Sequence, residues 1–126
     1  MKIRECFLAA VARVRAEGDA REAWVAMNRK NTPWAAVFDG ERLAGLLNGG
    51  DLREVVQTPE VFIAAGELAR EGVAARRALR LPPDGELGEA AMRMELAGAD
   101  AAFVEGRGRP PGVLEIARAR KALGRP

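Results

Sequence analysis

The residues best suited to bind a small molecule lie at positions 45–51, which read Gly-Leu-Leu-Asn-Gly-Gly-Asp. An apolar run at 43–47 overlaps this stretch, and a short amphipathic run at 51–56 follows it. A strand that gives way to a helix at a glycine-rich turn gathers backbone N–H groups in one place, where they can hold an anion or a sugar phosphate. Asp51 also suits the N-cap of the following helix, and the sequence leaves both roles open.

Side chains that could carry out catalysis are scarce. The 126 residues include no His and a single Cys, Cys6, so a Cys/His zinc site, a His-based catalytic triad and an internal disulfide are excluded. The carboxylates lie mostly at expected helix starts or on polar faces, without a recognisable nucleophile and base. We therefore predict that the protein is not an enzyme and has no catalytic residues, no metal site and no required cofactor.

The composition is typical of a globular protein, with 48% hydrophobic and 30% charged residues. No apolar stretch reaches the roughly 18 residues of a transmembrane helix, and the first residues lack the pattern of a secretory signal. We expect a cytoplasmic protein that does not enter a membrane. The net charge is only +2, and the basic positions near the C-terminus have no interleaved aromatic residues. Nucleic-acid binding is therefore not expected.

The sequence pattern predicts a helix and a hairpin before the glycine-rich turn at 45–51. Asp19 and Glu22 have the spacing of a capping box, and the pattern after them predicts a helix that ends near Asn31. A continuous apolar run predicts a buried strand at 34–38, and a hairpin turn then returns the chain as a strand at 42–47. The helix positions predicted to face the core are Ala20, Ala23, Trp24 and Met27.

The same order of elements occurs twice. When the numbering is shifted by 67, the alignment needs no gap from Glu22 and Glu89 to Arg53 and Arg120. Such a repeat predicts two similar modules that complete one core. The four helix positions then correspond to Leu87, Ala90, Ala91 and Met94.

Between the copies, the apolar pattern of residues 60–71 predicts a connecting helix. Residues 74–81 then lead into the second copy. The second hairpin differs from the first, because Pro110 and Pro111 stand where a strand would run. We expect that strand to be short or to lie at a sheet edge.

With this order of elements, the chain resembles a tandem pair of CBS domains, the module named after cystathionine β-synthase. The resemblance is carried by Ala23 and Met27 on the first helix, by the apolar strand at 33–39 and by residues 45–51. The last stretch is similar to the family's Gly-apolar-x-Thr/Ser-x-x-Asp signature. The helix–strand–strand–helix order, present twice, extends the resemblance over nearly the whole chain.

The resemblance implies an α/β (α+β) fold of two β-α-β-β-α repeats, at 1–59 and 60–126, packed as a pseudo-two-fold Bateman module. It also implies a regulatory sensor that binds AMP, ADP, ATP or S-adenosylmethionine in a cleft between the repeats. A homodimer and an effector protein acting in trans are the implied partners. The ligand-binding residues carried over by the resemblance are Leu46, Asn48, Gly50, Asp51, Leu79, Arg80, Leu81, Asp100 and Ala101.

In the family, the signature Asp accepts hydrogen bonds from the ribose hydroxyls, and Asp51 matches it. Asn48 replaces the family's hydroxyl residue; it can still donate and accept hydrogen bonds, with changed geometry. Arg80 could face a phosphate or simply be exposed. Asp100 would repel phosphates, which counts against a triphosphate.

The second signature, at 112–118, departs further from the family. Glu115 stands at the hydroxyl position and Arg118 at the Asp position, and Arg cannot accept hydrogen bonds from ribose. Glu115 and Arg118 could pair on the helix start, or Arg118 could bind another anion together with Arg13. These departures support an alternative function, a dimerisation or scaffold module without ligand.

Overall fold

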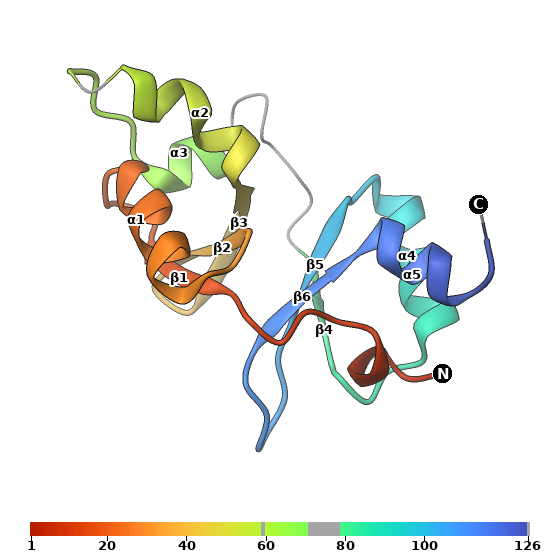
Figure 1. Ribbon diagram of the computed structural model, residues 1–126. Helices are drawn as coiled ribbons and strands as arrows, with labels where there is room; N and C mark the ends of the chain where they lie inside the picture. Colours follow the sequence, from red (N-terminus) through yellow and green to blue (C-terminus); the bar gives the residue numbers. More distant parts are fainter. Residues whose placement is uncertain (59, 71–78, 126) are drawn as a thin grey trace. The chain divides into compact units, whose positions relative to one another are not determined.

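The computed structural model describes residues 1–58, 60–70 and 79–125 (Figure 1). The chain divides into two compact units. We call Val11–Arg76 the first-repeat unit, and Met1–Ala10 together with Arg77–Pro126 the second-repeat unit. The predicted boundary between residues 59 and 60 does not coincide with this division, because Ala65–Arg70 packs on the strands of the first repeat and the first ten residues belong to the other unit. The limits of the sequence repeats themselves stay a prediction.

The first-repeat unit has a three-stranded sheet in the order β1-β2-β3, with β1 parallel and β3 antiparallel to β2. The predicted helix, the hairpin and the turn into a further helix are all present, but the helix begins at Arg21 with Ala20 as its N-cap, so the predicted capping box of Asp19 and Glu22 does not form. The elements are β1 (Ala12–Arg15), α1 (Arg21–Lys30), β2 (Trp34–Asp39), β3 (Arg42–Asn48), α2 (Gly49–Gln57) and α3 (Ala65–Arg70).

Small side chains in the core of this unit let helices and strands approach closely. The core includes Ala23 and Met27 on α1 and Ala35 on β2. Trp24, predicted to lie in the core, is 38% exposed, so this prediction is wrong. A core built largely on alanine leaves little room for an indole, and the Trp24 ring instead lies near Gly49 at the start of α2.

The segment predicted as a connecting helix has a different role. Within the predicted 60–71, only Ala65–Arg70 is helical among the residues that the structure describes, and this helix packs on β2 and β3. The Gly66 N–H donates to the Ala16 carbonyl at 2.8 Å, which ties α3 to the end of β1. Most of the predicted lead at 74–81 lies outside the described residues.

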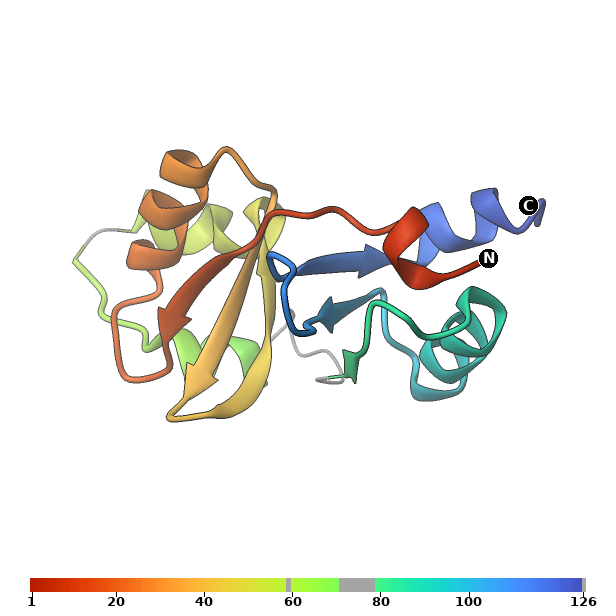
Figure 2. The same ribbon diagram turned by 90° about the horizontal axis from the view of Figure 1, so that it is seen from below.

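The second-repeat unit has its own three-stranded sheet, in the order β4-β5-β6 (Figure 2). As the two prolines predicted, β6 is short. The elements are a 3₁₀ turn at Ile3–Glu5, β4 (Arg80–Leu81), α4 (Leu87–Ala97), β5 (Ala101–Val104), β6 (Gly112–Glu115) and α5 (Ile116–Ala122).

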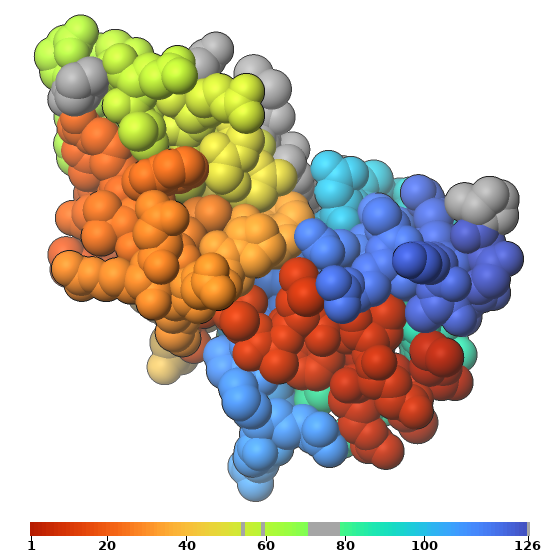
Figure 3. Space-filling view, viewed as in Figure 1, coloured from red at the N-terminus to blue at the C-terminus, as the bar shows by residue number. Residues whose placement is uncertain are grey.

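The N-terminal segment completes the second-repeat unit. Leu8 pairs with Val113 through two backbone hydrogen bonds of 2.9 Å, and the side chain of Ile3 is 1% exposed in the core of this unit. Figure 3 shows this segment in red against the blue surface of the same unit. Among the described residues, no helix has the length and apolar character needed to cross a membrane.

Candidate functional site

The turn from β3 into α2 is held by a reciprocal capping box. Oδ1 of Asn48 accepts a hydrogen bond from the Asp51 N–H at 3.0 Å, and Oδ2 of Asp51 accepts one from the Asn48 N–H at 2.8 Å. Asn48 is therefore the N-cap, and Asp51 occupies the third position of the helix. The suggestion that Asp51 is itself the N-cap is wrong, because the helix begins two residues earlier, at Gly49.

This geometry fixes the Asp51 carboxylate in the first turn of α2, at the positive end of the helix. The two helix positions before it are glycines, which carry no side chain. A pocket of about 480 Å³ lies beside this turn, lined in part by Gly50, Trp24 and Arg53. Leu46, on β3, is only 2% exposed and contributes to the interior.

The predicted residues of the second repeat lie at β4 and at the start of β5. Leu81 and Ala101 are buried, Leu79 is partly buried, and Arg80 and Asp100 are exposed. The structure therefore places Leu46, Asn48, Gly50 and Asp51 together in one unit and the other five residues in the other. That the two sets meet in one cleft stays a prediction.

Arg80 is engaged within its own unit. Its Nη2 donates to Oε1 of Glu105 at 3.0 Å, and its guanidinium carbon lies 5.8 Å from the centre of the Phe103 ring. A phosphate approaching Arg80 would compete with the Glu105 carboxylate. This arrangement weakens the expectation that Arg80 binds a phosphate.

In the second signature, at 112–118, Glu115 and Arg118 form the ion pair that their spacing allowed. Nε of Arg118 lies 3.9 Å from Oε1 of Glu115, at the start of α5. The Arg118 carbonyl also accepts a hydrogen bond of 3.6 Å from Sγ of Cys6. Burial raises the pKa of the Cys6 thiol more than Arg118 lowers it, so the thiol is protonated at neutral pH and is a poor nucleophile.

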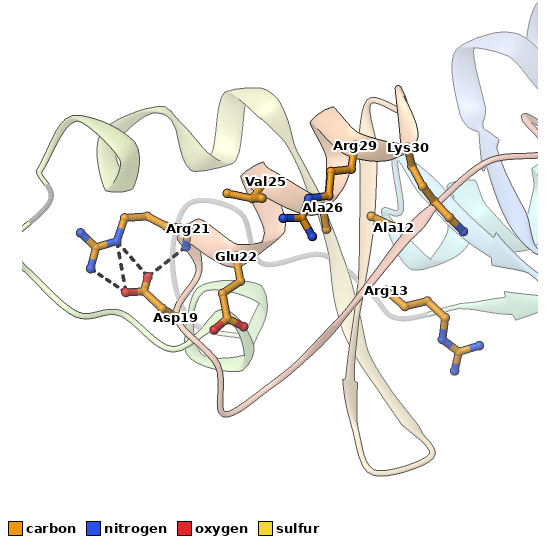
Figure 4. A pocket seen from close by; sticks show the side chains of 9 residues that line it. All are labelled: Ala12, Arg13, Asp19, Arg21, Glu22, Val25, Ala26, Arg29 and Lys30. Atoms are coloured by element: carbon orange, nitrogen blue, oxygen red, sulfur yellow. Dashed lines mark hydrogen bonds and ion pairs between the residues drawn. The ribbon is translucent and has the colours of Figure 1, made fainter.

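Sequence reasoning missed a groove of about 730 Å³ between α1 and β1 (Figure 4). At one end, Nε of Arg21 donates to Oδ1 of Asp19 at 3.0 Å, and the Arg21 N–H donates to the same oxygen at 2.9 Å. These hydrogen bonds hold the pKa of Asp19 below its ordinary value. The charged residues of α1 form two adjacent pairs about two turns apart, at 21–22 and 29–30. This spacing is equally typical of a solvated helix face, so periodicity did not indicate the groove.

A metal site has no support in the described part of the chain, where no three His, Cys, Asp or Glu side chains are grouped to hold an ion.

No family model matches the sequence, and no curated protein matches it significantly. Solved structures do match the fold. A CBS domain-containing protein of unknown function from Kribbella flavida is 14% identical, with a TM-score of 0.67, covering 100% of this chain and 99% of that one. The CBS domain pair of protein MJ0100, in complex with 5′-methylthioadenosine and S-adenosylmethionine, is 13% identical, with a TM-score of 0.66, covering 98% and 100%.

A third structure, Hypoxic Response Protein I with two coordinated zinc ions, is 20% identical, with a TM-score of 0.61, covering 97% of this chain and 98% of that one. Together with the two three-stranded sheets, one in each unit, these matches define the class of fold: two α/β repeats of similar topology. The chain has the fold of a CBS-domain pair, as the repeated order of helices and strands predicted.

Proposed function

We propose that this chain is a regulatory, non-catalytic module that binds an adenosine-containing ligand at the turn from β3 into α2. The observation that carries the proposal is the capping box, which fixes the Asp51 carboxylate next to two glycines at a helix start. A carboxylate held in this way can accept hydrogen bonds from the two hydroxyls of a ribose. The positive end of α2 would favour an anionic group on the same ligand.

Asn48 would contribute through its amide nitrogen. Its Oδ1 is taken up by the Asp51 N–H, whereas an amide nitrogen carries two N–H donors. Those donors suit a hydroxyl or phosphate oxygen, the role that a Thr or Ser hydroxyl has in the family signature. The asparagine is therefore compatible with ligand binding.

The complex of the MJ0100 CBS domain pair supports this ligand class, because that protein binds two adenosine derivatives on the same fold. S-adenosylmethionine, 5′-methylthioadenosine and AMP are the first compounds to test. In the proposed mechanism, the ligand binds one conformation of the pair more tightly, and the resulting shift in population is read by an effector protein. A homodimer is the proposed assembly.

A thermal-shift screen of the purified chain against these three compounds, ADP and ATP tests the proposal. A ligand that binds only the folded state adds about 2.7 kcal/mol at a hundredfold excess over its Kd, which raises Tm by several degrees. We expect this shift with at least one compound and expect Asp51→Ala to abolish it. A shift of the same size in Asp51→Ala would overturn the site.

The matched control is Glu86→Ala. Glu86 caps α4 by accepting a 2.8 Å hydrogen bond from the Glu89 N–H, so this variant also loses a helix cap, at a position without a predicted ligand role. It should start from a lower Tm and show the full ligand shift. The control thus separates loss of binding from loss of stability.

A ligand-free scaffold is the second candidate function. It is favoured by the ion pairs of Arg118 with Glu115 and of Arg80 with Glu105, which occupy side chains that a second or extended ligand would need. No thermal shift with any of the five compounds would favour the scaffold over the sensor.

A further inference from the structure

The groove between α1 and β1 lies outside the predicted adenosine site. It is formed by residues of the first-repeat unit alone, and its volume of about 730 Å³ is in the range of small-molecule pockets. Ala12, Val25 and Ala26 supply an apolar surface between its two ends. Figure 4 shows α1 running along the groove, with Arg21 and Glu22 near one end and Arg29 and Lys30 near the other.

The two ends of the groove differ in charge. Arg21 is paired with Asp19, so that end keeps the negative charge of Glu22. At the other end, Nζ of Lys30 donates to the Val11 carbonyl at 3.4 Å, and among the described residues Lys30 forms no ion pair with a carboxylate. Arg29 is exposed, and in the described part of the chain it contacts no carboxylate. Two adjacent cations therefore border an apolar surface.

The fold does not require these cations. With the shift of 67, Arg29 and Lys30 correspond to Leu96 and Ala97 on α4, which has no basic residue in its last turn. Helix α4 nonetheless ends with a left-handed Gly98, just as α1 ends with a left-handed Asn31. A helix end in this fold therefore does not require such a pair.

We propose that this groove binds a small organic anion, with an apolar body against Val25 and Ala26 and a phosphate or carboxylate at Arg29 and Lys30. The forked guanidinium of Arg29 can hold either acid group through two hydrogen bonds, and Lys30 adds a point charge. The Glu22 carboxylate at the far end would repel a second negative charge on the ligand. The favoured ligand thus carries its charge at one end.

Titration followed by ¹H–¹⁵N NMR tests this site, with phenyl phosphate and benzoate as probes. We expect amide shifts at residues 12–13 and 21–30, weaker binding at high salt, and much weaker shifts with inorganic phosphate or phenol alone. The probe that binds with the lower Kd shows whether the groove prefers a phosphate or a carboxylate. Shifts scattered over the surface, or equal shifts with inorganic phosphate, would overturn the proposal.

The deciding variant is Arg29→Leu/Lys30→Ala, which gives α1 the residues that α4 has at these positions. We expect its Kd for the better probe to rise at least tenfold. The control Arg42→Ala/Arg93→Leu removes two exposed cations elsewhere and should bind as the wild type does. Equal weakening in both variants would show a general charge effect and contradict the site. Asp51→Glu should leave probe binding unchanged, which keeps this test separate from that of the adenosine site.

Discussion

The carboxylate of Asp51 has a structural role whether or not a ligand is present. One of its oxygens accepts the Asn48 N–H, and the Asn48 side chain accepts the Asp51 N–H in return. Sequence reasoning identified the turn and the binding candidate Asp51. It did not assign the N-cap to Asn48, because Asn, Gly and Asp are all acceptable at a helix start and only coordinates show where the first turn begins.

Removal of the N-cap side chain should weaken the fold. We expect Asn48→Ala to lower the free energy of unfolding by about 1 kcal/mol, and Asn48→Ser to change it by only a few tenths, since a serine hydroxyl can accept the same N–H. Urea denaturation of the three proteins measures both effects. Equal stability of Asn48→Ala and the wild type would show that the capping box contributes nothing.

The pair of Asp19 and Arg21 should make stability depend on pH in the acid range. Hydrogen bonds from Arg21 hold the pKa of Asp19 below its ordinary value of 3.8, so folding favours the ionised form. The stabilisation is complete above the ordinary value and is lost as pH falls through the lowered pKa of the folded state. We expect Asp19→Asn to be less stable than the wild type at pH 7, with the gap closing below about pH 4. Urea midpoints at pH 7, 5 and 3 measure the gap, and a constant difference would contradict the pairing.

At the scale of elements, α3 depends on a small residue at its start. A Cβ on Gly66 would lie 2.6 Å from Cβ of Ala16 and 3.1 Å from the Ala16 carbonyl oxygen, so α3 would have to move away from β1. We expect Gly66→Ala to cost about 1–3 kcal/mol, measured by denaturation.

The control for this prediction is Gly88→Ala, at the same position of α4. There, a Cβ would meet a side-chain carboxylate oxygen of Glu86 at 3.1 Å rather than backbone, and a side chain can shift by a few tenths of an ångström, so we expect little loss or a slight gain in stability. Alanine favours a helix more than glycine does, so an equal loss of stability in both variants would show that the close approach of Gly66 to Ala16 is not the cause.

Local patterns predicted most elements but not their packing partners. Residues 34–38 are continuously apolar and are buried as β2, and the hairpin turn after them forms with Gly40 at a φ of 62°. The helix at 65–70 was found but was interpreted as a connector. Its contact with Ala16 links positions fifty residues apart, and no short-range pattern records such a contact. Trp24 was misplaced because periodicity gives the face of a helix but not the space available there.

At the scale of the whole molecule, the chain begins in the second-repeat unit. Ile3 is buried in the core of that unit, and the Ile3 N–H donates to the Gly85 carbonyl at 2.9 Å. We expect Ile3→Ala to cost about 2–5 kcal/mol, because it leaves a cavity in a small core. Hydrogen exchange should show the loss of protection in α4, β5 and β6.

Leu96→Ala is the control, since it removes a side chain of similar size that is 83% exposed. Unchanged protection in the second-repeat unit of Ile3→Ala would contradict its role in that core. The sequence repeat did not reveal this N-terminal contribution, because the shift of 67 aligns residues within the repeats and carries no information on the segment before them.

The measurement that tests the central claim most directly is calorimetric titration of the wild type and Asp51→Glu with the adenosine compound that gives the largest thermal shift. A glutamate at the third helix position keeps the capping box, so the fold should be retained while the carboxylate moves away from the ribose position. We predict an unchanged Tm and a Kd at least tenfold weaker. Equal Kd values for the two proteins would show that Asp51 does not hold the ligand and would contradict the proposed site.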